Sequence, residues 1–102
     1  MKCINDLDNL KENEIIKGNL DSKEWNLMFK EKDTTRSNTN YIFYGISENK
    51  KLIEYHCFKN NINVLNGKIV QEDLRYGDDF CFISEETKRY KEVEKLFMEA
   101  IN

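Results

Sequence analysis

The sequence has no proline, only four glycines and a single histidine, and it lacks a long hydrophobic run. No Gly/Ser/Pro-rich linker divides its 102 residues, a length typical of one domain. No apolar run approaches the ~20 residues needed to cross a bilayer. The first ten residues alternate polar with apolar side chains, unlike a signal peptide. We therefore expect residues 1–102 to form a single cytoplasmic domain with no membrane contact.

The cysteines are few and widely spaced: Cys3, Cys57 and Cys81. A disulfide-stapled secreted domain would carry an even set, and a structural zinc site would carry closely spaced pairs. The sequence thus predicts three reduced thiols, with no metal and no cofactor.

Neither sign of charge is in large excess, since the formal net charge is −3 and the isoelectric point is near 5.2. A general nucleic-acid binder needs a basic face, so direct nucleic-acid binding is disfavoured. The apolar fraction is modest, and large aromatic rings are expected to supply much of the core. The candidate core aromatics are Phe29, Tyr41, Phe43, Tyr44, Tyr55, Phe58, Phe80, Phe82 and Phe97.

No Gly-rich phosphate loop, GxSxG or HExxH motif is present, so the sequence predicts a protein that is not an enzyme. His56 and Cys57 are adjacent and would point to opposite faces of a strand. His56 could meet Cys81 if their strands were neighbours, but a thiol site would also need an orienting partner and an oxyanion hole. We interpret His56 as an ordinary strand residue and keep the thiol enzyme as a third hypothesis.

Periodicity predicts most of the strands. Trp25, Leu27 and Phe29 alternate as in a half-buried strand, whereas residues 41–46 are apolar on both faces, as in a central strand. Toward the N-terminus we expect a helical turn that gathers Ile4, Leu7 and Leu10, and then a strand that starts at Ile15 and Ile16 and is interrupted by Gly18. Residues 33–40 are expected to form a polar loop, and residues 52–58 a returning strand with Ile53, Tyr55 and Cys57 on one face. Asn66 and Gly67 predict a hairpin between residues 62–65 and 68–70, and residues 80–83 predict a final short strand.

The C-terminal residues predict an amphipathic helix. Ser84 is the expected N-cap, and Glu85 and Glu86 would complement the positive end of the helix dipole. Apolar residues then recur at helical spacing: Tyr90, Val93, Leu96, Phe97, Ala100 and Ile101.

The predicted fold class is therefore α+β. We expect a curled antiparallel sheet of about five to six short strands, either an SH3- or OB-like half-barrel or a flat sheet, with the C-terminal helix packed on it. An RNA-recognition motif fits poorly, because that fold needs a helix between its first two strands and residues 33–40 offer only a polar loop.

Two charged groups are candidates for a contact surface. The first is an acidic loop whose members are Glu72, Asp73, Arg75, Tyr76, Asp78 and Asp79. Its spacing does not match the ligands of an EF-hand, so we interpret it as a solvated protein-binding loop anchored by Arg75 and Tyr76. The second is a basic sheet edge formed by Lys30, Lys32, Arg36, Lys50 and Lys51.

The run from Asn40 to Phe58, followed by Phe82-Ile83-Ser84-Glu85-Glu86-Thr87-Lys88 and Leu96-Phe97, resembles small β-rich proteins of bacteriophages and mobile elements. Some of those proteins are anti-CRISPR or other anti-defence inhibitors. The resemblance covers about half of the chain and carries no site residue with it. It implies a non-catalytic inhibitor that binds a bacterial or phage protein stoichiometrically, with a nucleic-acid-handling effector of host immunity as the expected target. The alternative is a module that binds a nucleotide or single-stranded nucleic acid through exposed aromatic rings.

Overall fold

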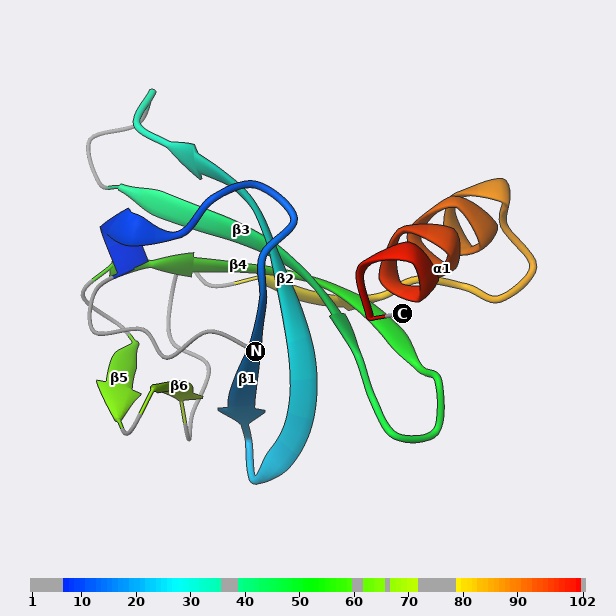
Figure 1. The fold of residues 1–102 in the computed structure, drawn as a ribbon, viewed down its shortest axis with the longest axis horizontal. Helices are drawn as coiled ribbons and strands as arrows, with labels where there is room; N and C mark the ends of the chain where they lie inside the picture. Colours follow the sequence, from blue (N-terminus) through cyan, green and yellow to red (C-terminus); the bar gives the residue numbers. More distant parts are fainter. Residues whose placement is uncertain (1–6, 36–38, 60–61, 66, 72–78, 102) are drawn as a thin grey trace.

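One seven-stranded sheet and a C-terminal helix make up the computed structural model, which describes residues 7–35, 39–59, 62–65, 67–71 and 79–101 (Figure 1). The elements in chain order are η1 (Leu7–Asn9), β1 (Ile15–Leu20), β2 (Lys23–Asp33), β3 (Asn40–Ile46), β4 (Leu52–Phe58), β5 (Asn63–Leu65), β6 (Lys68–Gln71), β7 (Asp79–Phe82) and α1 (Lys88–Ile101). The fold is α+β, as the sequence predicts. The expected helical turn is the 3₁₀ segment η1, and Ile4 lies outside the described residues.

The strands follow the order β5-β6-β1-β2-β3-β4-β7. Neighbours are antiparallel except for β1 and β6, which run parallel with Gly18 opposite Ile69. The prediction of five to six strands was therefore too low, and the sheet is mostly rather than wholly antiparallel. The expected hairpin is confirmed, since Leu65 pairs with Lys68 and Gly67 has a φ of 77°. Asn66 lies outside the described residues.

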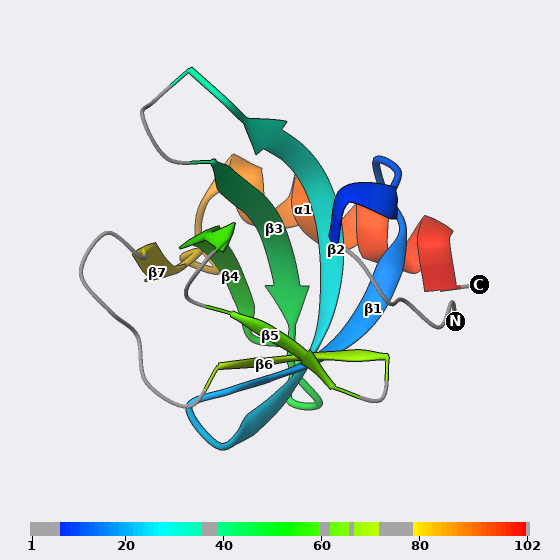
Figure 2. The same cartoon turned by 90° about the vertical axis from the view of Figure 1, so that its left-hand side faces the viewer.

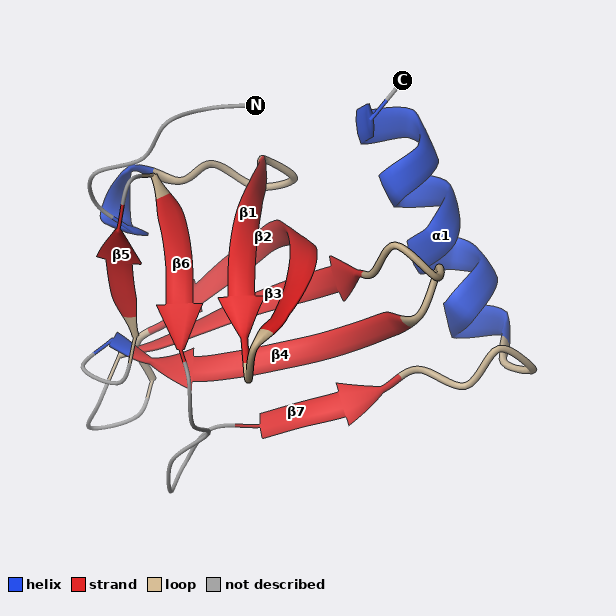
Figure 3. Ribbon diagram, turned by 90° about the horizontal axis from the view of Figure 1, so that it is seen from below, coloured by secondary structure: helices blue, strands red, loops and turns tan. Residues whose placement is uncertain are grey.

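The sheet is strongly curled. In Figure 3, β5, β6 and β1 run across the direction of β3, β4 and β7, and the long strand β2 bends from one group to the other. Contacts cross the concave face: the ring of Trp25 on β2 lies 5.7 Å from that of Phe80 on β7, and the Tyr55 hydroxyl on β4 donates to the Gln71 side-chain carbonyl on β6. A flat sheet is thereby excluded.

The concave face holds the larger core. Its buried members from the central strands are Ile16, Leu20, Trp25, Leu27, Phe29, Tyr41, Phe43, Ile53, Tyr55 and Cys57. The predicted one-face sets of residues 25–29 and 53–57 are all in this cluster, which confirms those two strands and their orientation. Leu7 and Leu10 cover its open end from the segment around η1.

β1 does not stop at Gly18, contrary to the sequence prediction. The strand runs through this glycine, which pairs with Trp25, and the Leu27 side chain occupies the space of the missing β-carbon: an ideal Cβ on Gly18 would lie 2.3 Å from Leu27 Cδ1. Gly45 on β3 is similar, with an ideal Cβ 2.8 Å from Ile53 Cγ1. Leu27 thus packs between two glycines on the strands that flank β2, where the curl is formed.

The convex face carries the helix. Leu27 and its neighbour Met28 point to opposite faces and both are fully buried, so β2 contributes to two cores. α1 lies behind the strands in Figure 2 and packs through Val93 and Phe97. The remaining members of this second core are Leu52 and Ile83, with Ile15, Tyr44, Ile46, Tyr90 and Leu96 partly buried against it.

The helix begins later than predicted. Its N-cap is Thr87, whose Oγ1 accepts from the Tyr90 amide at 3.2 Å, and not Ser84. The Ser84 carbonyl instead accepts from both the amide and the hydroxyl of Thr87, at 3.1 and 2.7 Å. Ser84 therefore supports the turn before the helix, and Glu85 and Glu86 precede the first helical residue.

Candidate functional site

Five of the six predicted contact residues, Glu72, Asp73, Arg75, Tyr76 and Asp78, lie outside the described residues. The sixth, Asp79, is exposed and is the first residue of β7. The acidic segment therefore leads directly into the strand at one edge of the sheet, and β7 is the place where a contact surface can be analysed.

β7 pairs with β4 on one side only. Its register is antiparallel, with Phe82 opposite Ile53 and Phe80 opposite Tyr55, and the Ile83 amide donates to the Leu52 carbonyl at 2.9 Å. Because backbone groups alternate sides along a strand, Cys81 and Ile83 direct their N–H and C=O groups toward β4. Those of Phe80 and Phe82 point away from β4, and within the described residues no strand pairs with that side.

Three rings lead from the core to this edge. Trp25 is buried, Phe80 meets it edge-on, and the ring of Phe82 lies 5.5 Å from that of Phe80 in a T-shaped arrangement. Phe82 is 62% exposed, so its prediction as a core residue was wrong. The outermost ring is thus large, apolar and accessible, yet supported from beneath by two others, which is typical of an interface anchor.

A groove of about 410 Å³ adjoins Phe82 between the end of β7 and the start of α1. Its lining residues are Lys51, Leu52, Phe82, Ile83, Ser84, Glu85 and Tyr90. The Tyr90 hydroxyl donates to the Lys50 carbonyl at 2.8 Å, and burial, together with Glu94 and Glu85, raises the pKa of Tyr90. The groove therefore combines an apolar floor with a neutral phenol and one ion pair, Lys51 to Glu85 at 3.7 Å.

A polar group lies on the convex side of the same strands. Glu54 on β4 binds Arg89 of α1 and lies 3.1 Å from His56 Nε2. Cys81 is exposed directly across from Glu54, so His56 and Cys81 lie on the same face of neighbouring strands, which meets one condition of the thiol-enzyme hypothesis. Glu54 contacts both His56 and Arg89, and its ion pair with Arg89 fastens the helix to the sheet.

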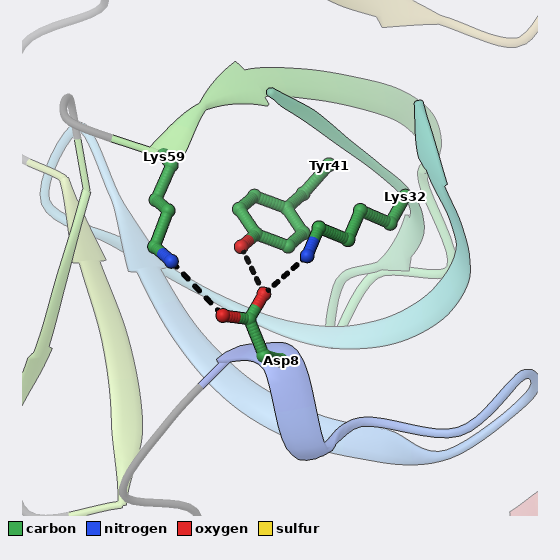
Figure 4. A network of polar contacts seen from close by, with 4 residues as sticks. All are labelled: Asp8, Lys32, Tyr41 and Lys59. Atoms are coloured by element: carbon green, nitrogen blue, oxygen red, sulfur yellow. Dashed lines mark hydrogen bonds and ion pairs between the residues drawn. The ribbon is translucent and has the colours of Figure 1, made fainter. Parts of the chain in front are cut away.

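A second polar cluster joins η1 to the sheet (Figure 4). The Asp8 carboxylate accepts from the Tyr41 hydroxyl at 2.6 Å and from the ammonium groups of Lys59 and Lys32, each at 2.9 Å. The hydrogen bonds from Tyr41, Lys59 and Lys32 hold the pKa of Asp8 far below its usual range. The sequence gives no signal for this cluster, because its members are distant in the chain and belong to no motif.

The predicted basic edge is wrong for the residues that can be placed. β2 lies between β1 and β3, and a bulge between Phe29 and Glu31 sends its lysines to different partners. Lys30 binds the Asn13 side chain at 2.7 Å and covers the Tyr44 ring, whereas Lys32 binds Asp8. Lys51 pairs with Glu85, Lys50 occupies the β3–β4 turn, and Arg36 lies outside the described residues.

Within the described ranges, no three His, Cys, Asp or Glu residues are grouped so that they could hold a metal ion. In the same part of the chain, no helix has the length and apolar character to cross a membrane.

Comparison with known proteins found no match among family models, curated proteins or solved structures. The geometry of the β7 edge therefore carries the functional argument.

Proposed function

We propose that this protein is a non-catalytic protein-binding inhibitor whose contact surface is the β7 edge together with the adjoining groove. The observation that carries the proposal is the ring of Phe82, which is 62% exposed beside edge backbone groups that pair with no strand of the described residues. An exposed apolar ring on an edge strand promotes aggregation in a protein that has no partner. In a protein that acts by binding, the same ring and strand provide a contact surface for the partner.

Rigidity supports this role. The Phe82 ring is held by Phe80 and Trp25, so binding would cost less side-chain entropy than it would for an isolated flexible residue. Asp79 begins the same strand, and the preceding residues 72–78, with Arg75 and Tyr76 among them, are proposed to extend the surface. The kind of target, a bacterial defence effector met by a phage-encoded protein, rests on the sequence resemblance alone.

A second candidate function is binding of single-stranded nucleic acid. The exposed ring of Phe82 could stack on a base, and Lys51 in the adjoining groove could meet a phosphate. The other large rings of the concave face, however, belong to the core. The nucleic-acid hypothesis therefore has one exposed ring in its favour, whereas the protein-binding proposal uses the ring, the edge and the groove.

The test is affinity capture from a lysate of the natural host, with and without nuclease treatment. We expect one protein at a stoichiometric level that survives nuclease and is recovered in a clearly reduced amount with Phe82→Ala. The matched control is Met98→Ala, which removes a comparably exposed hydrophobic side chain, 51% exposed, from the helix. Recovery of nucleic acid alone would favour the second candidate. Equal capture by both variants would show that the surface lies elsewhere.

A further inference from the structure

We propose that the partner binds by strand addition: an extended segment pairs with the open side of β7, with apolar residues opposite Phe80 and Phe82 and a basic residue opposite Asp79. The inference rests on the proposed protein-binding function and specifies how the partner is recognised. Three features of β7 support it: the outward N–H and C=O groups of Phe80 and Phe82, the alternation of side chains between the two faces of the strand, and the carboxylate of Asp79.

The backbone gives the hydrogen bonds. Phe80 and Phe82 each direct one N–H and one C=O away from β4, whereas those of Cys81 face β4. An antiparallel segment would therefore exchange hydrogen bonds with these two phenylalanines through every second residue. Main-chain pairing of this kind supplies affinity in many peptide-binding domains.

The side chains of β7 determine the sequence pattern that the partner segment needs. Residues paired across strands share a face, so the two partner residues opposite Phe80 and Phe82 would lie on the concave side, against the exposed ring of Phe82. The residue between them, opposite Cys81, would lie on the convex side. Two apolar residues separated by one position are thus required of the partner.

Charge fixes the register. Asp79 is exposed, and its carboxylate has no ion pair among the described residues. The convex side beside it also carries Glu54, which already binds Arg89 and contacts His56. A lysine or arginine opposite Asp79 would find an unpaired carboxylate there, whereas an acidic residue would be repelled. In an antiparallel segment the order is apolar, any residue, apolar, basic.

The probe is a capped peptide of sequence TVTVRT, whose V-T-V-R core would pair with residues 82, 81, 80 and 79. We expect saturable shifts of the Phe80 and Phe82 amide signals in NMR titrations of the full chain. N-methylation of either valine should abolish binding, because each valine N–H would donate to β7. N-methylation of the threonine between them should not, because its N–H would point outward.

Charge reversal gives an independent check. TVTVET should bind on the order of 2- to 10-fold more weakly than TVTVRT, in keeping with the energies of cross-strand charge pairs. In the Asp79→Lys variant the order of affinities should be reversed, with TVTVET binding more tightly than TVTVRT. On the protein side, Phe82→Pro should lose binding, since it removes the outward N–H at an edge position that tolerates proline. Phe82→Ala, which keeps that N–H, should only weaken it.

Three outcomes of the peptide titrations and of sedimentation would overturn the inference. The first is no binding by any peptide, and the second is equal binding by the valine-methylated peptides. The third is a dimer of the wild-type chain in sedimentation that Phe82→Ala dissociates and TVTVRT does not, which would assign the edge to a second copy. A host protein captured equally by wild type and Phe82→Pro would refute both strand addition and the β7 surface, and would leave only a binding function elsewhere on the protein. Peptide binding without any captured host protein would refute the inhibitor proposal instead.

Discussion

The Cδ1 atom of Leu27 lies where a β-carbon of Gly18 would have to be, 2.3 Å from its ideal position. Gly18→Ala should therefore lower the free energy of unfolding by about 1–3 kcal/mol through overpacking in a fully buried site. Urea denaturation measures the loss. Asn19→Ala, on the opposite face of the same strand, should stay within about 0.5 kcal/mol of wild type.

A double-mutant cycle tests the cause. Leu27→Ala removes the obstructing atom at its own cost of about 2–5 kcal/mol. In that background, Gly18→Ala should cost little, so the two substitutions should be clearly non-additive. If Gly18→Ala were equally damaging in both backgrounds, the backbone of β1 and not the contact with Leu27 would be responsible.

Asp8 should make stability depend on pH. Hydrogen bonds from Tyr41, Lys59 and Lys32 place its folded-state pKa far below the unfolded value of ~3.9, so the stabilisation is present above that value. The difference in urea midpoint between wild type and Asp8→Asn should be constant from pH 7 to about 5 and shrink as the pH falls below ~4. The control is Asp21→Asn, an exposed aspartate whose carboxylate makes no ion pair within the described residues. A difference that grew on acidification would contradict the assignment.

The helix cap offers a direct comparison of two hydroxyls. Thr87→Ala should destabilise the protein by about 1 kcal/mol, because the Tyr90 amide loses its acceptor. Ser84→Ala should cost less, since Ser84 contributes its backbone carbonyl to the turn. Thermal unfolding followed by circular dichroism distinguishes them, and a larger effect at Ser84 would restore the cap predicted from the sequence.

Burial of α1 against the convex face predicts a strong asymmetry between two adjacent helix residues. Phe97 is fully buried and Met98 is 51% exposed. Phe97→Ala should lower the unfolding free energy by about 3–5 kcal/mol, whereas Met98→Ala should change it by no more than about 0.5 kcal/mol. Similar losses at both positions in urea denaturation would mean that the exposed side of the helix is covered in solution.

Local patterns predicted the elements whose signals are local. Alternation identified the strands around Trp25 and Tyr55, and Asn66-Gly67 identified the hairpin. The features that the sequence does not predict depend on contacts between residues distant in the chain. Gly18 reads as an interruption unless the position of Leu27 is known, and the parallel pairing of Gly18 with Ile69 leaves no trace in either segment.

The candidate site was predicted only at its beginning. The charge of Asp79 indicates a contact residue, and Asp79 begins the edge strand. Alternating aromatics are usually buried and therefore predict a core position for Phe82, whereas the sheet order places it at an edge. The lysines of β2 suggest an edge for the converse reason, since their sequence cannot reveal that β1 and β3 flank them.

The parallel contact between β1 and β6 also constrains how the chain reaches its native state. β1 to β4 pair in sequence order through adjacent hairpins, so each step closes only a short loop. The β5–β6 hairpin is local as well, but its attachment to β1 joins segments separated by three intervening strands. We expect this docking to be the slow step of folding, with the concave core incomplete until it occurs.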